Sequence, residues 1–232
     1  MDQERAAILI NACFESLEEA SELIDKDHSL LFEINGLGET PLHYLAVENQ
    51  LDAVKFLFSR GAELNTISDC AGTPLSEAAS LGYFDLVKFL LENGANMNQL
   101  PDGDPIIFEA VRSGNPEVVD LLVRYGADIN DRDFMGQTPL HESSSDDELL
   151  EVTKYFVHQG VNIDAIDGFN LTPLAASALH GCFETVKFLV SSGASLTIKD
   201  AKGMTPVAIA KNQNYQEIAK WLLKAEIKAQ KP

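Results

Sequence analysis

The stretch Gly38–Asn65, GETPLHYLAVENQLDAVKFLFSRGAELN, contains the pattern from which the rest of the chain is built. It begins with Thr-Pro-Leu-His, continues through two stretches of helical apolar spacing and ends with Gly-Ala-Glu-Leu-Asn. The opening recurs at residues 73–75, 138–141, 172–174 and 205–207, and the ending recurs at 94–98, 126–130, 160–164 and 193–197. The spacing from Thr40 to Thr73, and from Thr172 to Thr205, is 33 residues. The chain is therefore an array of internal repeats.

Each repeat starts with residues that favour the beginning of a helix. Thr40 is a good N-cap, because its hydroxyl can accept a hydrogen bond from a free amide of the first turn. Pro41 fits the first helical position, where its missing N–H is not needed. Leu42 begins an apolar face with i, i+3, i+4 spacing. A second helix is predicted over 51–58 and ends at Gly61 in a left-handed conformation, so each unit is a pair of antiparallel helices followed by a loop.

The period and the Thr-Pro-Leu-His signature resemble the ankyrin repeat. The resemblance covers nearly the whole chain and implies an all-α fold, a solenoid of stacked antiparallel helix pairs with projecting β-hairpin-like loops. We expect a single domain over 1–232, because such an array grows by adding units and not by enlarging one core. Its predicted parts are an N-terminal capping helix pair at 1–34, repeats at 35–67, 68–99, 100–132, 133–166 and 167–199, and a C-terminal capping repeat at 200–232.

Two repeats depart from the pattern. Repeat three has Pro105-Ile106-Ile107 in place of Thr-Pro-Leu. Repeat four has one extra residue between Thr138 and Gly160, in an acidic turn that contains Asp146-Asp147-Glu148. A calcium loop needs spaced ligands and an intervening glycine, which this run lacks, so we interpret it as a solvated or partner-facing turn.

The chain is strongly acidic, with a formal net charge of −19 over 232 residues. Residues 199–232 nevertheless hold seven lysines against three acids, a local +4, so the remainder carries −23. Such a field repels nucleic acid and anionic membrane surfaces and steers basic partners. The alternative is that the charge serves solubility alone.

Other features indicate a soluble, cytoplasmic protein, which we expect to be a monomer. No apolar run approaches the length of a transmembrane helix, and the first residues, MDQERAAILINACF, lack the basic start of a secretory signal. The three cysteines are far apart and fit reduced thiols.

No motif for catalysis or cofactor binding is present among the phosphate-loop, dinucleotide, zinc-protease and nucleophile-elbow patterns. His43 and His141 occupy the histidine position of Thr-Pro-Leu-His, and the resemblance implies that each imidazole bridges neighbouring backbone segments. His180 lies at the turn between the two helices of repeat five, where it either is structural or faces a partner. We predict no enzymatic activity, no cofactor and no metal.

The resemblance places binding at the loop tips and on the exposed side of the first helices. Phe134, Met135, Phe169 and Leu171 make two neighbouring tips apolar, and aromatic residues and methionine are enriched at interface centres. The alternative is that the two rings pack on each other. We add to these tip residues several acidic residues and residues of the first helices. The predicted partner-binding residues are Phe134, Met135, Phe169, Leu171, Leu179, His180, Asp102, Asp104, Asp146, Asp147, Arg112 and Asp69.

The sequence thus predicts a protein–protein interaction module that binds a basic protein through its loop tips and concave groove. We favour a stand-alone inhibitor or immunity-type neutralising protein, because the repeats leave no room for an effector domain. An adaptor that bridges two partners is the alternative, and it requires two separable binding faces.

Overall fold

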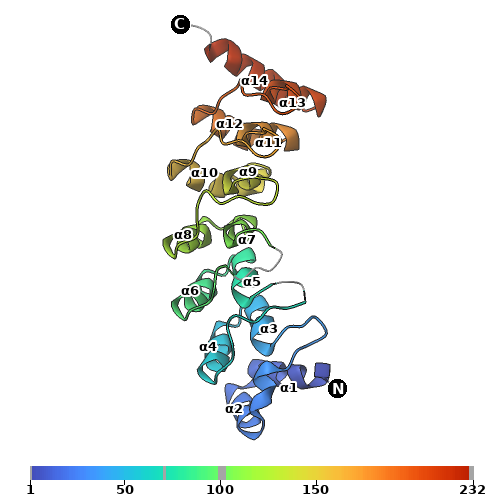
Figure 1. Cartoon of the computed structure of the whole chain (residues 1–232), viewed down its shortest axis with the longest axis vertical. Coiled ribbons are helices and arrows are strands. Elements are labelled where there is room, and N and C mark those ends of the chain that lie inside the picture. Colours follow the sequence, from blue (N-terminus) through green and yellow to red (C-terminus); the bar gives the residue numbers. More distant parts are fainter. Residues whose placement is uncertain (1, 70–71, 99–102, 230–232) are drawn as a thin grey trace. The chain divides into compact units, whose positions relative to one another are not determined.

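The structure, a computed structural model, describes residues 2–69, 72–98 and 103–229, and every regular element in them is a helix. The predicted all-α fold is confirmed. The helices form two compact units, residues 1–113 (unit 1) and 114–232 (unit 2), so the division falls inside the predicted repeat three. Figure 1 shows the paired helices of each unit with their connecting loops.

Unit 1 contains an N-terminal helix pair followed by the helices of the first repeats. The first helices of successive repeats pack on one another, α3 on α5 and α5 on α7. The elements are α1 (Asp2–Glu15), α2 (Leu17–Lys26), the 3₁₀ helix η1 (His28–Phe32), α3 (Pro41–Val47), α4 (Leu51–Ser59), α5 (Pro74–Ser80), α6 (Phe84–Glu92) and α7 (Ile106–Arg112).

Unit 2 continues the alternation of short first helices and longer second helices. Helix α11 packs between α9 and α13, and α12 contacts α10 and α14. The elements are α8 (Pro116–Arg124), α9 (Pro139–Ser143), the 3₁₀ helix η2 (Asp147–Leu149), α10 (Leu150–His158), α11 (Pro173–His180), α12 (Phe183–Ser191), α13 (Pro206–Asn212) and α14 (Gln216–Ala229).

The threonines begin the first helices as the sequence predicts. The Thr73 hydroxyl accepts a hydrogen bond from the Ser76 amide at 3.1 Å, and the Thr172 hydroxyl accepts one from the Ala175 amide at 3.2 Å. Helix α7 follows Pro105, whose side chain can make no such cap. The degenerate start of repeat three therefore begins a helix without the usual capping hydrogen bond.

Glycine ends the second helices in the predicted left-handed conformation. Gly61 has a φ of 99° and Gly193 has a φ of 97°, values that side chains disfavour. Each is followed by a buried alanine, Ala62 or Ala194, whose amide bonds back to a helix carbonyl. The turn thus closes each unit and directs the chain into the next loop.

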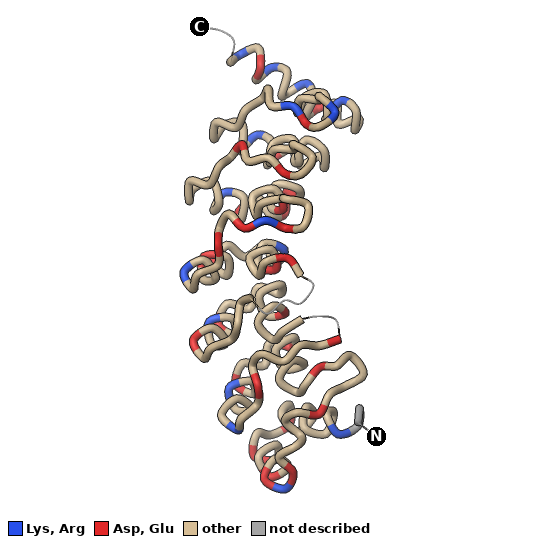
Figure 2. Tube along the Cα trace, in the orientation of Figure 1, with Lys and Arg blue, Asp and Glu red and all other residues tan. Residues whose placement is uncertain are grey.

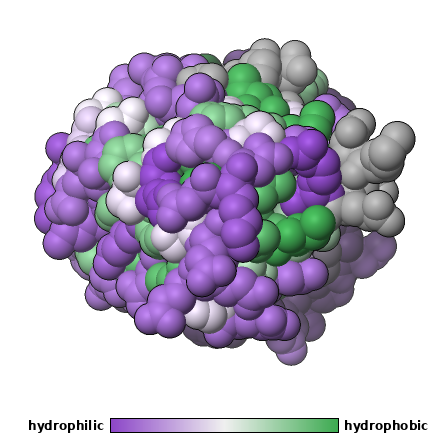
Figure 3. Space-filling model, turned by 90° about the horizontal axis from the view of Figure 1, so that it is seen from below, coloured by the Kyte–Doolittle hydropathy of each residue, from purple (hydrophilic) through white to green (hydrophobic). Residues whose placement is uncertain are grey.

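The N-terminal helix pair has one face in the core and one face in water. Ala20 and Ile24 of α2 are buried, whereas Glu18, Glu22 and Asp25 are exposed. Figure 3, which views the structure from below in the frame of Figure 1, shows a surface that is mostly hydrophilic with smaller apolar areas. Phe14 of α1 is 48% exposed and contacts Tyr44 edge to face.

Candidate partner-binding site

The loop tips of unit 2 are built by the same five-residue turn in each repeat. Asp133, Asp167 and Asp200 each accept two backbone hydrogen bonds at one carboxylate oxygen, from the residues two and four positions later. This arrangement resembles an Asx-turn, in which the side chain replaces a backbone acceptor. The fourth residue has a positive φ in all three, as Gly136, Asn170 and Gly203. The aspartate and the positive-φ residue together fix the backbone of each turn.

Neighbouring tips are joined by backbone hydrogen bonds. The Gly168 amide donates to the Met135 carbonyl at 2.9 Å, and the Ala201 amide donates to the Phe169 carbonyl at 2.8 Å. Gly168 is needed here, because a Cβ at this position would lie 2.7 Å from the Met135 carbonyl oxygen. The tips of repeats four, five and six therefore form one continuous edge of unit 2.

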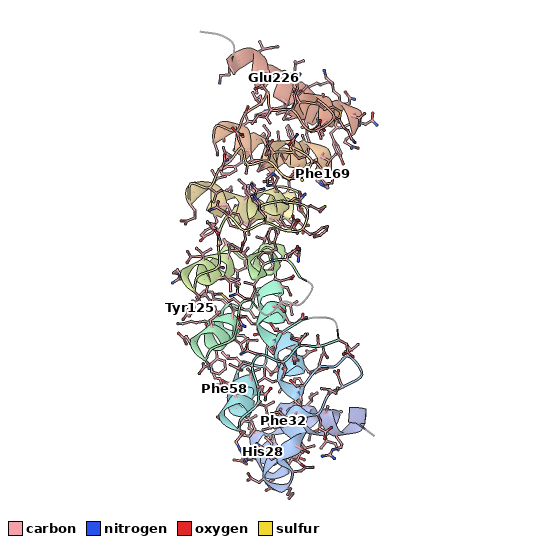
Figure 4. All side chains as sticks on the ribbon, in the orientation of Figure 1. His28, Phe32, Phe58, Tyr125, Phe169 and Glu226 are labelled. Carbon is pink, nitrogen blue, oxygen red and sulfur yellow. The ribbon has the colours of Figure 1, made fainter. Side chains whose placement is uncertain are left out.

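Three apolar side chains at this edge are exposed to solvent, whereas Leu171 is half-buried. We define the tip cluster as Phe134, Met135, Phe169 and Leu171. Phe134 is 88% exposed, Phe169 is 55% exposed and Met135 is 37% exposed. No ring pair joins the two phenylalanines among the described residues, which argues against the alternative in which the rings pack on each other. In Figure 4, Phe169 lies on the loop before α11 and on the outer side of it.

A small cavity lies beside the tip cluster, between the loops and first helices of repeats five and six. Its volume is about 160 Å³, and its lining includes Phe169, Leu171, Leu179 and Met204. The structure thus brings three of the predicted binding residues to one hollow. His180, at the C-terminal end of α11, is exposed and does not line it.

His141 lies behind the tips and joins two repeats, as the resemblance implies. Its Nδ1 accepts a hydrogen bond from the Thr138 amide at 3.1 Å, and its Nε2 lies 3.0 Å from the Leu171 carbonyl. An amide can only donate, so Nδ1 carries no proton and Nε2–H donates to Leu171. Burial lowers the pKa of His141, against the opposing effect of the Leu171 carbonyl. The ring is therefore a neutral structural group.

His43, the equivalent histidine of repeat one, is also buried, and burial favours its neutral form. Burial lowers the pKa of His43, whose Nδ1 lies 3.0 Å from the Thr40 hydroxyl. Its Nδ1 also lies 3.2 Å from the Thr66 hydroxyl, and hydrogen bonding to the backbone of Gly72 and Thr66 opposes the lowering of its pKa. His43 therefore repeats the local part of the His141 arrangement.

The acidic turn of repeat four has a structural role that the sequence did not indicate. The Asp147 carboxylate accepts hydrogen bonds from the Thr185 amide at 2.9 Å, the Thr185 hydroxyl at 2.8 Å and the Glu184 amide at 3.3 Å. These amides belong to the first turn of α12, whose own N-cap residue, Cys182, makes no side-chain cap. Asp147 thus caps a helix of the next repeat and is not available as a partner-facing acid. Asp146 is exposed and caps η2 through the Glu148 amide.

The other predicted acidic positions lie in unit 1 and differ in their surroundings. Asp104 forms an ion pair with Arg112 at 2.8 Å, and Arg112 also contacts Glu109 at 2.8 Å. Asp69 is exposed, and its amide donates to the Leu37 carbonyl, as at the tips of unit 2. Asp102 lies outside the described residues. The opposite charge of Arg112 reduces what Asp104 can offer to a basic partner.

Two residues of this surface were missed by the sequence reasoning. Met204 occupies the fifth position of its turn, as Leu171 does, and lines the cavity. Arg132 donates hydrogen bonds to the carbonyls of Gly136 and Ile166 and so links two loops. The position of Met204 in the repeat could have identified it, whereas no local pattern marks Arg132.

Within residues 2–69, 72–98 and 103–229, no three histidine, cysteine or acidic side chains gather where they could hold a metal ion. Over the same part of the chain, no helix has the length and apolar character needed to span a bilayer. The buried thiols of Cys13 and Cys182 have pKa values raised to about 11, mainly by burial, so both are poor nucleophiles at neutral pH.

The stacked helix pairs, capped starts and glycine turns define a helical repeat protein. The family described as ankyrin repeats in three copies matches residues 1–68, 75–167 and 140–231. The chain belongs to the ankyrin-repeat family, and ankyrin repeats are generally a non-catalytic fold for protein–protein interaction.

Similar proteins include regulators and a channel. Human protein phosphatase 1 regulatory subunit 27 is 48% identical over 65 residues, which are 28% of this chain and 42% of that protein. Human transient receptor potential cation channel subfamily A member 1 is 28% identical over 186 residues, 75% of this chain and 17% of that protein. The ADP-ribosylation factor GTPase-activating protein AGD2 of Arabidopsis thaliana is 35% identical over 72 residues, 31% of this chain and 9% of that protein. The chain thus spans less than half of the length of each of these relatives.

Proposed function

We propose that this protein captures a protein partner on the tip cluster and the adjoining cavity of unit 2, and that it acts as a stand-alone inhibitor of that partner. The observation that carries the proposal is the exposure of Phe134 and Phe169 on loops that hydrogen bonds hold in place. Exposing an aromatic ring of this size forgoes about 1.5–3 kcal/mol of burial. A partner that covers both rings recovers this free energy.

The rigidity of the tips supports binding with little ordering cost. Each turn is fixed by its aspartate and by a backbone hydrogen bond to the neighbouring tip. Ordering a loop on binding costs free energy, and hydrogen bonds already order the backbone of these loops in the free protein. The cavity beside Leu179 and Met204 would accept an apolar side chain of the partner.

We propose that the partner is basic. The charge of −23 outside residues 199–232 attracts positively charged proteins and raises their rate of association. Asp146 is exposed in unit 2 and remains in the proposed site, whereas Asp147 is left out because its carboxylate is occupied. The apolar cluster therefore provides affinity, and the acidic field provides rate and selectivity.

An inhibitory role is consistent with a relative that is named a regulatory subunit of a protein phosphatase. As an inhibitor, the present chain would regulate its partner by covering part of the partner's surface. An adaptor is the second candidate, and it is favoured by the contrasting charge of the last repeat, with its seven lysines. Two binding faces of opposite charge would allow two partners to be held at once.

The proposal is tested by purifying the tagged protein with its bound partners from its native cells, beside the Phe134→Ala/Phe169→Ala variant. We expect a basic protein to bind the wild type near one-to-one and to bind the variant with about 2 kcal/mol or more lost, roughly 30-fold. Tyr125→Ala serves as a control, because Tyr125 is an exposed aromatic residue of unit 2 directly after α8 and not on a loop tip. Equal binding by the double variant would remove the tips from the site.

A kinetic measurement separates the charge proposal from the apolar one. Asp146→Lys should slow association and flatten its dependence on salt, with little change in dissociation. An association rate that does not respond to salt would assign the acidic charge to solubility.

A further inference from the structure

Helix α14 is longer than the second helices of the inner repeats. It has 14 residues, whereas α4, α6, α8, α10 and α12 have nine each. Matching Lys187-Phe188-Leu189 with Lys220-Trp221-Leu222 places Glu226 where Gly193 ends repeat five. Without a glycine at that position the helix continues, so α14 extends beyond the end of α12.

This extension creates an open groove within unit 2. The groove has a volume of about 680 Å³ and lies between α14 and the end of α12 with its following turn. Its floor is apolar and includes Val190, Ala194, Leu196, Trp221 and Ala225. The volume falls within the range of about 300–1,000 Å³ for ligand sites.

The charged residues of the groove are two lysines. Lys224 and Lys228 belong to its lining, which contains no acidic residue among those that the structure describes. They are one helical turn apart and so lie on the same side of α14. Both are exposed, and neither has an ion pair with any described residue. Figure 2 shows their end of the chain with several basic positions, and Figure 4 labels Glu226 between them in sequence on α14.

In the second helices of the inner repeats, in contrast, basic residues form ion pairs. Lys187 of α12 pairs with Glu184 at 2.5 Å, and Lys154 of α10 pairs with Glu151 at 2.6 Å. In α8, Arg124 pairs with Asp120 at 2.8 Å. The unpaired lysines of α14 are therefore a local feature of the last repeat and not a general property of the fold.

We propose that this groove, the lysine groove, binds an amphipathic acidic helix of a second protein. An apolar stripe on such a helix would cover Trp221 and the aliphatic floor, and two carboxylates one turn apart would face Lys224 and Lys228. The pair of cations favours two spaced negative charges over a single one. The acidic remainder of the chain repels the same peptide, which restricts it to this site. The inference goes beyond the tip site and supplies the second face that an adaptor needs.

The test uses Trp221, the only tryptophan of the chain, as its reporter. The full-length protein is titrated with a synthetic peptide of roughly three helical turns, with leucines on one face, glutamates at i, i+4 spacing beside them, and no tryptophan or tyrosine. A second peptide carries glutamine at every glutamate. We expect a saturable change in Trp221 emission with the acidic peptide, and binding at least about tenfold weaker with the glutamine peptide.

Variants on the exposed surface locate the effect. Lys224→Glu/Lys228→Glu should weaken binding of the acidic peptide by at least about tenfold, and Ala225→Phe should block it by filling the groove. Lys220→Glu is the matched control, because Lys220 is exposed on the same helix but does not line the groove. It should leave binding within about twofold of the wild type. Circular dichroism confirms that each variant keeps its helical content.

Several outcomes would overturn the proposal. They are the absence of a saturable emission change, an equal response to both peptides, and an equal loss with Lys220→Glu. A response to laurate without a response to the peptide would assign the groove to a lipid-like anion. Emission that changes with protein concentration alone would assign it to a second copy of this chain.

Discussion

Repeat four contains two regions, only a few residues apart, with opposite properties. Thr138 and His141 are buried and hydrogen-bonded, and their Thr-Pro-Leu-His motif also opens repeat one. Phe134 and Met135 are exposed, and no other tip has the same pair. The comparison shows that residues repeated along the chain build the units. The exposed tip residues differ between repeats, so they can determine which partner is bound.

The largest expected difference between buried and exposed positions is at two phenylalanines of unit 2. Phe156 of α10 is fully buried, whereas Phe134 is almost fully exposed. We expect Phe156→Ala to cost about 3–5 kcal/mol of unfolding free energy, through lost burial and a cavity. Phe134→Ala should cost about 0.5 kcal/mol or less. Denaturant unfolding measures both, and a cost at Phe134 comparable with that at Phe156 would contradict the exposed position of its ring.

Asp147 should show that the inserted turn belongs to the framework. Asp147→Ala removes the acceptor for three hydrogen bonds at the start of α12. We expect a loss of about 2 kcal/mol in unfolding free energy, the upper range for an N-cap. Glu148→Ala, at an exposed neighbouring position, should change stability by about 0.5 kcal/mol or less. Equal effects of the two substitutions would contradict the capping role.

The buried histidines predict a loss of stability on mild acidification. Burial lowers the pKa of His141 below its ordinary value of 6.5, so the unfolded chain binds a proton more readily than the native protein. Stability is therefore retained above pH 6.5 and falls as the pH drops toward the native pKa. Each pKa unit of lowering is worth about 1.4 kcal/mol.

This pH effect can be assigned by comparing variants. His141→Asn should reduce the slope of unfolding free energy between pH 7 and 5, whereas Gln159→Asn, at an exposed position without a titratable side chain, should leave it unchanged. Thermal or urea unfolding at several pH values gives the slopes. The same slope in all three proteins would show that His141 does not contribute.

A small effect on stability is expected for the tip cluster. Phe134→Ala/Phe169→Ala should change the unfolding free energy by less than about 1 kcal/mol, since both rings contact solvent. The same variant should lose most of its partner binding. Calorimetric unfolding of the purified variant, with no partner present, checks the first statement. A large loss would mean that the rings support the fold.

Local sequence patterns predicted most of the fold. Thr73, Pro74 and Gly61 begin and end helices through interactions within a few residues, and such interactions can be inferred from the sequence. The repeated motif also indicated the bridging role of His141. The resemblance to ankyrin repeats placed Phe134 at a loop tip, and its ring is exposed there.

Contacts between distant residues could not be predicted in the same way. The Asp147 cap joins residues 37 and 38 positions apart, and the sequence shows only a run of acids. The Arg112 ion pair with Asp104 was also missed, and both residues were assigned to the binding surface. The length of α14 follows from Glu226 in place of a glycine, but the lysine groove also depends on how α14 packs beside α12 and its following turn, which neither segment shows alone.

The central claim is that a partner contacts the tips of repeats four and five, and photo-crosslinking tests it most directly. A benzophenone amino acid is placed at 134, at 169, or at 125 as a control, and each protein is irradiated in its native cells. Figure 4 shows Phe169 on the loop side of unit 2 and Tyr125 on the side of the second helices. We expect positions 134 and 169 to form a covalent product with the same protein and position 125 to form none. A product from position 125 alone, or none from either tip, would contradict it.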